Sequence, residues 1–232
     1  MTFINKNIKF LREQKQMTHS QLATMCNMTV DLLKTVENGA FEPKLDDLIS
    51  LATALNFPVE RLITDNLEKN HYNMKSFTFK FLALDVDGVM TDAGVYYTEN
   101  GDEMKKFNAK DGLAIKTLVA AGKYVGFITS GKNNKIVENR AELLGVQKVF
   151  VGTWKKTEVI ESWCKELKID FENVAYIGDD VNDLAAIKKS GLSACPADAV
   201  TLVKSAVDII LSKKGGEGCV REFVDKYIME VK

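Results

Sequence analysis

Apolar residues in the first part of the chain recur at intervals of three and four, the spacing of one buried helix face. Thr18 or Ser20 can cap a second helix. Thr29 can cap a third helix, and Gly39 can end it. The positions with helical spacing are Ile8, Leu11, Leu22, Ala23, Met25, Leu32, Leu33, Val36, Leu45, Leu48, Ile49, Leu51, Leu55, Leu62 and Ile63. The pattern predicts a small all-α domain over residues 1–66, and the polar stretch LEKNHYNMKS predicts a linker over residues 67–76.

From residue 77 the pattern changes to short β-rich runs that alternate with helical segments, which is typical of an α/β domain with a parallel sheet covered on both faces. In the helical segment DGLAIKTLVAAG, Asp111 is expected to cap the start and Gly122 the end. Residues 95–108 instead predict a hairpin. The predicted strands are FTFKFLAL, YVGFITS, KVFVG, VAYIG, LSACP and VDIILS. This second domain, residues 77–232, is expected to be Rossmann-like.

Composition narrows the classes of partner. The chain has 31 Lys and Arg against 32 Asp and Glu, a net charge of -1, so it has no overall attraction to nucleic acid or an anionic membrane. The four cysteines are far apart in sequence and only two histidines accompany them, which indicates free thiols rather than a zinc site or disulfides. No apolar run reaches the length of a membrane span. We therefore expect a cytoplasmic protein without a membrane partner.

Polar residues follow the predicted strands at the ends where a parallel sheet binds ligands. They are Asp85, Asp87, Ser130, Lys156, Asp179 and Asp180. Carboxylates are the ligands that Mg²⁺ prefers, and Mg²⁺ needs only one or two of them beside a substrate phosphate, so Asp85 and Asp179 suffice with a backbone carbonyl. The pattern predicts a magnesium site that binds a phosphate ester.

These residue types suit phosphoryl transfer. Asp85 can attack phosphorus in line and form an aspartyl-phosphate, while Asp87 gives a proton to the leaving oxygen and later takes one from water. Ser130 and Lys156 can hold the phosphoryl oxygens. Each residue taken alone is more simply explained as a turn cap or a solvated side chain, but their joint occurrence in order favours a catalytic site.

The segments DVDGVMTD and GDDVND, with Ser130 and Lys156 between them, resemble the four motifs of haloacid dehalogenase superfamily phosphatases. GDEMKKFNAKDGLAI, KIVENRAELLGV, PADA and GGEGCVREF further resemble the 3-deoxy-D-manno-octulosonate 8-phosphate (Kdo-8-phosphate) phosphatase branch. The resemblance covers residues 77–227 and implies a capless fold with a β-hairpin flap. It also implies Mg²⁺ as cofactor, an acidic sugar phosphate as substrate and a place in lipopolysaccharide biosynthesis.

The resemblance assigns roles residue by residue. Asp85 is the implied nucleophile and metal ligand, Asp87 the acid and base that lends its carbonyl to the metal, and Asp179 the other carboxylate ligand. Asp180 and Asp183 match supporting acidic positions. The branch forms homotetramers in which neighbouring subunits and a Gly-rich tail close the site. We expect Gly215, Gly216 and Gly218 to form such a mobile tail, so that truncation after Ser212 affects substrate affinity or product release more than stability.

Two departures from the branch concern substrate contacts. The segment SGK stands where Thr-Gly-Arg is common, which makes Gly131 and Lys132 candidate substrate contacts. Lys110 stands where an arginine is common. Lysine keeps the charge but lacks the bidentate fork of arginine, so the preferred substrate can differ from Kdo-8-phosphate, and nonulosonate 9-phosphates are the alternative.

Residues 8–63 resemble the Cro/C1-type helix-turn-helix through Thr18, Gln21-Leu22-Ala23, Glu37, Gly39 and Pro43. The resemblance makes His19, Thr29, Val30 and Lys34 the candidate DNA contacts. Residues 1–70 nevertheless carry eight basic against nine acidic side chains, a poor electrostatic basis for DNA binding. Two roles stay open for this domain: operator binding, in a transcription factor whose second domain senses a sugar phosphate, or self-association beside a phosphatase.

Overall fold

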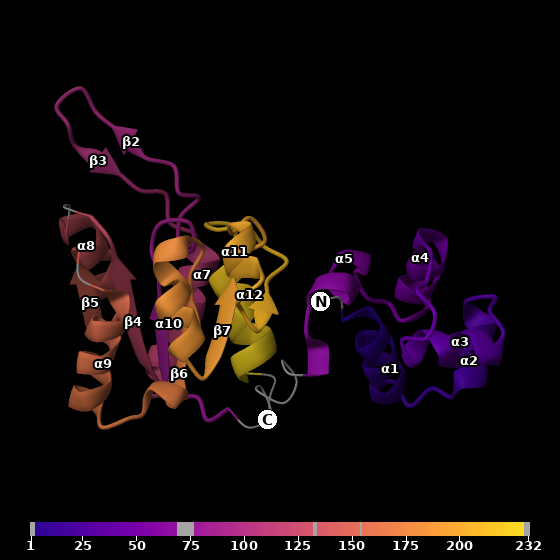
Figure 1. The fold of residues 1–232 in the computed structure, drawn as a ribbon. Helices are drawn as coiled ribbons and strands as arrows, with labels where there is room; N and C mark the ends of the chain where they lie inside the picture. Colours follow the sequence, from indigo (N-terminus) through magenta and orange to yellow (C-terminus); the bar gives the residue numbers. More distant parts are fainter. Residues whose placement is uncertain (1–2, 69–76, 132–133, 154, 230–232) are drawn as a thin grey trace. The chain divides into compact units, whose positions relative to one another are not determined.

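The computed structural model describes residues 3–68, 77–131, 134–153 and 155–229 (Figure 1). The chain folds as two compact units, residues 1–72 and 73–232. The domain boundaries expected from the sequence, at 66 and 77, fall near this division, and most of the expected linker lies outside the described residues. Each unit has its own hydrophobic core and is described separately below.

The first unit is a bundle of short helices around one apolar core, with Ile8, Leu22, Leu33 and Leu51 fully buried. Its helices are α1 (Ile4–Gln14), α2 (His19–Met25), α3 (Val30–Glu37), α4 (Leu45–Ala54) and α5 (Val59–Thr64). Thr18 caps α2 in a reciprocal capping box with Gln21, and Thr29 caps α3 through the backbone N–H of Leu32. The expected all-α fold is confirmed.

The second unit contains a six-stranded parallel sheet in the order β5-β4-β1-β6-β7-β8 (Figure 1). The strands are β1 (Phe81–Leu84), β4 (Tyr124–Thr129), β5 (Lys148–Val151), β6 (Val174–Ile177), β7 (Leu192–Cys195) and β8 (Ile209–Ile210). Every expected strand is present. The central strand β1 is fully buried, which explains its unbroken apolar sequence, and residues that follow β1 and β6 meet at one end of the sheet.

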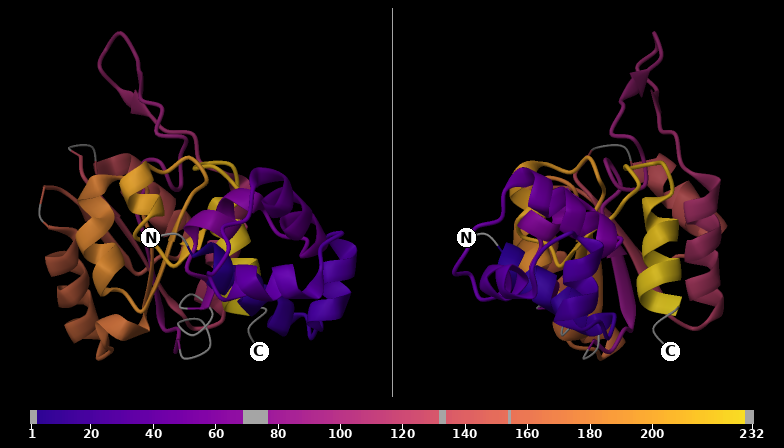
Figure 2. Two further views of the ribbon diagram at one scale, coloured as in Figure 1. Left: turned by 45° about the vertical axis from the view of Figure 1, so that its right-hand side comes forward. Right: turned by 90° about the vertical axis from the view of Figure 1, so that its right-hand side faces the viewer.

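Helices cover both faces of this sheet (Figure 2). One apolar cluster joins the sheet to α7 (Ala109–Ala120), α8 (Asn134–Leu144) and α12 (Cys219–Phe223). The other joins it to α9 (Lys156–Leu167), α10 (Leu184–Lys189) and α11 (Thr201–Lys204). Residues of β1 alternate between the two clusters, as the two-residue period of a strand requires. Two short 3₁₀ helices, η1 (Phe171–Asn173) and η2 (Val181–Asp183), and a π-helix, η3 (Val224–Met229), complete the described part of the unit.

The start of α7 differs from the expectation. Asn108, rather than Asp111, caps the helix, because its side chain accepts the backbone N–H of Lys110. Asp111 lies buried in the first turn and accepts the backbone N–H of Arg221 at 2.7 Å. Gly122 follows the helix with φ +72°, as expected of a residue that ends a helix.

A β-hairpin stands between β1 and α7, as expected, and projects beyond the end of the sheet (Figures 1 and 2). Its strands are β2 (Tyr96–Tyr97) and β3 (Glu103–Met104), paired antiparallel. We call residues 95–108 the flap. Because the flap comes between β1 and α7 in the sequence, its side chains can reach back toward the end of β1.

The Gly-rich segment is not a free tail, and this expectation was wrong. Gly215 packs so closely on the loop after β1 that an added Cβ would lie 1.9 Å from the carbonyl oxygen of Gly88. Gly216 donates its N–H to Val89 at 3.0 Å. The residues that follow, among them Val220 and Phe223, are fully buried in the core. Truncation after Ser212 would therefore remove core side chains and is expected to cost stability first.

The four cysteines, all among the described residues, are buried and form no disulfide. Within the described ranges, no helix combines the length and the apolar character that crossing a membrane requires.

Candidate active site

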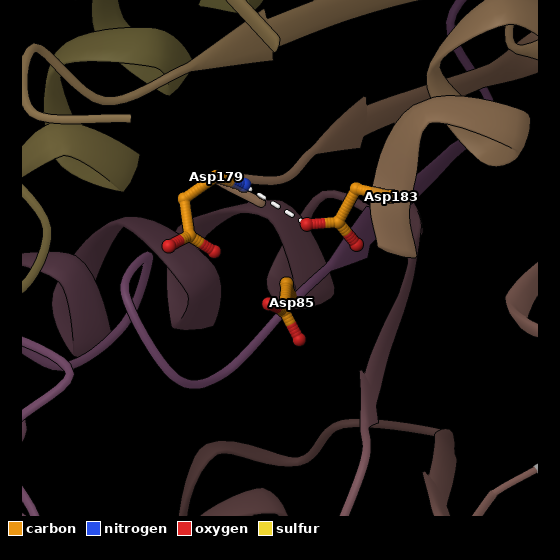
Figure 3. Close-up of side chains that lie close together, drawn as sticks. All are labelled: Asp85, Asp179 and Asp183. Atoms are coloured by element: carbon orange, nitrogen blue, oxygen red, sulfur yellow. Dashed lines mark hydrogen bonds between the residues drawn. The ribbon is translucent and has the colours of Figure 1, made fainter. Parts of the chain in front are cut away.

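Three carboxylates converge at the end of the parallel sheet (Figure 3). Asp85 follows β1, Asp179 follows β6, and Asp183 lies in the turn η2 before α10. One oxygen from each lies within 4.8 Å of the others. Asp85 and Asp183 are buried, with 5% and 0% exposure. Buried carboxylates this close repel one another strongly unless cations compensate them, so the arrangement requires positive charge.

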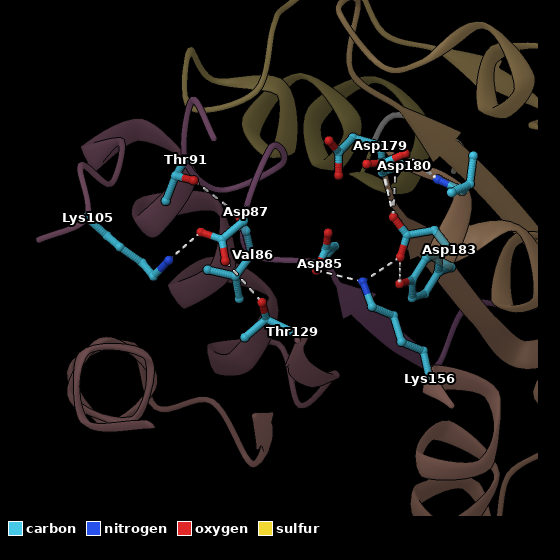
Figure 4. A network of polar contacts seen from close by, with 12 residues as sticks. Asp85, Val86, Asp87, Thr91, Lys105, Thr129, Lys156, Asp179, Asp180 and Asp183 are labelled. Carbon is cyan, nitrogen blue, oxygen red and sulfur yellow. Dashed lines mark hydrogen bonds and ion pairs between the residues drawn. The ribbon is translucent and has the colours of Figure 1, made fainter. Parts of the chain in front are cut away.

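Lys156 supplies part of that charge. It is the first residue of α9, and its ammonium group lies 2.8 Å from Asp85 Oδ1 and 2.6 Å from Asp183 Oδ1 (Figure 4). The side chain is only 5% exposed. Burial lowers the pKa of Lys156, but the ion pairs with both carboxylates outweigh burial and raise it overall. Lys156 is therefore a fixed cation between the two buried acids.

Asp183 positions the other members of the group. Its carboxylate accepts a hydrogen bond from the hydroxyl of Tyr176 at 2.5 Å. It also accepts the backbone N–H groups of Asp179 and Asp180 at 2.9 and 3.2 Å (Figure 4). Together with Lys156, these donors satisfy both of its oxygens. Asp183 is thus fixed in place, and it holds the turn that carries Asp179 over Asp85.

The charge of the group remains negative. Burial raises the pKa of Asp85 well above its usual range, the Asp183 carboxylate raises it further, and Lys156 lowers it only in part. Burial, and then the charge of Asp183, raise the pKa of Asp179 from 3.8 to about 6. Both shifts have the same main cause, which is burial, and the charge of Asp183, which one ammonium group does not balance, adds to it.

The residues present fit a divalent metal ion. Within the described part of the chain, the buried Asp179 Oδ1 has no hydrogen-bond partner, and a buried carboxylate oxygen left without a donor is a free ligand. Gly88 has φ +86°, and a Cβ there would lie 2.1 Å from Asp179 Oδ2, so only glycine leaves room for this carboxylate. Asp85 and Asp179, with Asp183 beside them, form an oxygen donor set suited to a hard cation.

Asp87 lies beside this group and is held by two donors (Figure 4). Lys105, from the flap, places its ammonium group 2.5 Å from Asp87 Oδ1. Thr129, the last residue of β4, donates its hydroxyl to Asp87 Oδ2 at 3.1 Å. Neither residue was among the sequence candidates. Lys105 lies in the run EMKKF of the flap. Charged residues in a two-stranded hairpin usually face water, so this run alone did not indicate a contact with the site.

The other candidates are more exposed. Ser130 lies one residue beyond β4 and is exposed, so its role stays a prediction. Asp180 is also exposed, and its carboxylate accepts the backbone N–H of Val181 at the start of η2. Lys110 and Gly131 are exposed, and their contact with a substrate stays a prediction. Lys132 lies outside the described residues.

In the first unit, the helix-turn-helix candidates have different surroundings. His19 Nε2 lies 3.1 Å from Glu37, which also forms a buried ion pair with Arg12 at 2.7 Å. Thr29 uses its hydroxyl as a helix cap, Val30 packs against the core, and Lys34 is exposed. DNA binding through these residues stays a prediction.

Comparison with known families identifies both units. Residues 132–223 match the haloacid dehalogenase-like hydrolase family, and residues 8–62 match a helix-turn-helix family.

Curated relatives of the second unit are 3-deoxy-D-manno-octulosonate 8-phosphate phosphatases named KdsC. The protein of Haemophilus influenzae is 41% identical over 146 residues, which is 63% of this chain and 81% of that protein. The protein of Escherichia coli K12 is 37% identical over 155 residues, which is 67% of this chain and 82% of that protein.

Solved structures give the same result. The Moraxella catarrhalis phosphatase, in complex with magnesium, phosphate and KDO, has a TM-score of 0.65 and 32% identity. The match covers 69% of this chain and 91% of that one. The cobalt-bound Haemophilus influenzae phosphatase has a TM-score of 0.63 and 38% identity, over 68% of this chain and 90% of that one.

Proposed function

The chain belongs to the 3-deoxy-D-manno-octulosonate 8-phosphate phosphatase family of haloacid dehalogenase-like hydrolases and is therefore a phosphoric monoester hydrolase that acts on sugar phosphates; on this premise, we propose that its substrate is a small acidic sugar phosphate and its metal Mg²⁺. The observation that carries the proposal is the buried group of Asp85, Asp179 and Asp183 with Lys156. A magnesium-bound relative of the same fold supports the choice of metal.

In the proposed reaction, a carboxylate oxygen of Asp85 attacks phosphorus, and the bond from phosphorus to the sugar oxygen breaks as an aspartyl-phosphate forms. Asp87, in its protonated form, gives its proton to the departing sugar oxygen. Asp87 then takes a proton from water as that water attacks phosphorus, which releases phosphate and restores Asp85. Bound Mg²⁺, held by Asp85 and Asp179, would neutralise charge between the carboxylates and the phosphate. Lys156 would balance charge on the phosphoryl oxygens throughout.

A substrate panel tests this function. Purified full-length protein with Mg²⁺ is given Kdo-8-phosphate, nonulosonate 9-phosphates and glucose 6-phosphate, and phosphate release is measured. We expect kcat/KM for one acidic sugar phosphate to exceed that for glucose 6-phosphate by about 10²-fold or more, because a site built for a carboxylate rejects an analogue that lacks one. Chelation of the metal should abolish release, and equal turnover of acidic and neutral sugars would contradict the proposed specificity.

The affinity for Mg²⁺ is expected to depend on pH. Metal binding requires ionised carboxylates, and the pKa of Asp179 is raised to about 6 by burial and by Asp183. Asp179 is therefore ionised above pH 6 and protonated below it, so affinity should fall as pH is lowered through about 6. Calorimetric titration with Mg²⁺ at about pH 7.5 and pH 5.5 measures this. Asp179→Asn should bind weakly at both values, and a wild-type affinity unchanged by pH would count against Asp179 as a ligand.

We further propose that the protein is a homotetramer. The flap presents Val95, Tyr96, Tyr97 and Met104 with 58%, 48%, 66% and 54% exposure, and a projecting two-stranded hairpin gains stability when such residues are covered. Neighbouring flaps would also cover a site over which the described residues place no inserted cap domain. Light scattering of the full chain should give the mass of four copies, and Tyr97→Asp should reduce it. An active monomer at assay concentration would contradict the proposal.

A further inference from the structure

The flap is tied to the active site by one side chain. Lys105 follows β3, and its ammonium group lies 2.5 Å from Asp87 Oδ1 (Figure 4). The same group lies 2.8 Å from Glu103. The Lys105 side chain is only 8% exposed although the neighbouring flap strands are largely exposed. Burying the charge of a lysine costs free energy unless that charge is paired. The path of the flap places Lys105 where Asp87 and Glu103 pair its charge.

The two oxygens of Asp87 are held from different sides. Lys105 contacts Oδ1 from the flap, and Thr129 donates to Oδ2 from the sheet. The Asp87 side chain itself is 37% exposed, so packing alone does not fix its orientation. A carboxyl group that gives a proton must point at the reacting oxygen to within a few tenths of an ångström. The position of the flap therefore determines part of the geometry of Asp87.

The next lysine along the flap provides a natural comparison. Lys106 is 64% exposed and pairs with Asp92 at 2.7 Å, away from Asp87. It has the same charge and lies on the same hairpin, yet makes no bond to Asp87 among the described contacts. If the positive charge of the flap affects activity in general, substitution of either lysine will change the activity. If the contact with Asp87 is what matters, only substitution of Lys105 will change it.

We propose that Lys105 is a positioning residue that orients the carboxyl group of Asp87 from the flap, so that its protonated form can give its proton to the leaving sugar oxygen. The inference rests on the proposed function, because it assigns Asp87 the role of acid. It follows that the flap has two roles, because it covers the site and also aligns the acid Asp87. Charge attraction between Lys105 and the phosphate is a different role, and it predicts a different kinetic result.

Lys105→Met tests the proposal, because methionine resembles the apolar stem of lysine but lacks the ammonium group. Phosphate release is measured with the best sugar phosphate of the panel and with p-nitrophenyl phosphate, whose leaving group needs no proton. We expect kcat for the sugar phosphate to fall at least about tenfold, kcat for p-nitrophenyl phosphate to change less than about threefold, and KM to stay within about twofold. Lys105→Arg should restore most of the sugar phosphatase activity, and Lys106→Met should match the wild type.

Three outcomes would overturn the proposal. Equal losses with both substrates would assign Lys105 to phosphate binding, a rise in KM alone would assign it to substrate binding, and no change would leave the contact without a kinetic role. Circular dichroism and thermal unfolding show whether each variant folds. If Lys105→Met does not fold, Thr129→Val removes the other bond to Asp87 and must give the same difference between substrates. A wild type that fails on every sugar phosphate would instead refute the proposed function.

Discussion

Asp85→Asn is expected to abolish phosphate release while the protein stays folded. The amide has the shape of the carboxylate but is not a nucleophile, and it is a poor ligand for Mg²⁺. We expect kcat to fall by at least about 10³-fold, as for the loss of other covalent nucleophiles. Stability should not fall, because the pKa of Asp85 is raised by burial and by Asp183, which means that the folded state already disfavours its charge.

The measurement is phosphate release from the best sugar phosphate, with thermal unfolding in parallel. Asp92→Asn is the matched control, since Asp92 lies in the same loop region but pairs with the exposed Lys106. It should retain near wild-type activity. Release by Asp85→Asn at a rate close to that of Asp92→Asn would remove Asp85 from the role of nucleophile.

The fold of the second unit could be predicted because its signals are local. Each strand is a short run of apolar residues, and β1 is buried on both faces, so its sequence is apolar without alternation. The rule that ligands bind at the carboxyl ends of parallel strands then brought Asp85 and Asp179 together, although 94 positions separate them in the sequence. The structure confirms that these carboxylates converge.

The errors concern contacts between segments that are distant in sequence. Asp111 and Asn108 are both good helix caps by composition, and only the packing of α12 against α7 shows that Asp111 is used to hold Arg221. The glycines near residue 216 were typical of a mobile tail by composition. In the structure, Gly215 allows close approach to the backbone of Gly88 instead. Composition gives the conformational freedom of a glycine but not what occupies the space.

Lys105 and Thr129 show the same limit at the site itself. The sequence predicts that Ser130, just after β4, holds phosphoryl oxygens, and this role stays a prediction. Thr129, the residue before it, was not a candidate, and its hydroxyl reaches Asp87 because successive side chains along a strand point in opposite directions. Lys105 reaches Asp87 only because the hairpin returns toward the sheet, which depends on the path of the flap.

Lys156→Met is expected to have the second large effect, on both activity and stability. Lys156 is the ammonium group that bridges Asp85 and Asp183, and both carboxylates are buried. Its loss leaves two buried negative charges close together, and removing one partner from a buried ion pair typically costs about 3–5 kcal/mol. Loss of the charge opposite the phosphoryl oxygens should lower kcat by about 10²-fold or more.

The loss of stability should depend on pH in a defined direction. Without the ammonium group, which lowers the pKa of Asp85 in part, that pKa rises further above its unfolded value, so the folded variant binds more protons than the unfolded chain. Its stability relative to the wild type is therefore expected to recover as pH falls toward about 5 and to decrease as pH rises above neutrality. Chemical unfolding at several pH values measures this.

Lys155→Met, which removes the neighbouring lysine with 82% exposure, is the control and should behave like the wild type. If Lys156→Met unfolds like Lys155→Met at every pH, the three carboxylates do not depend on Lys156 for their charge balance, and its place in the catalytic group would have to be withdrawn.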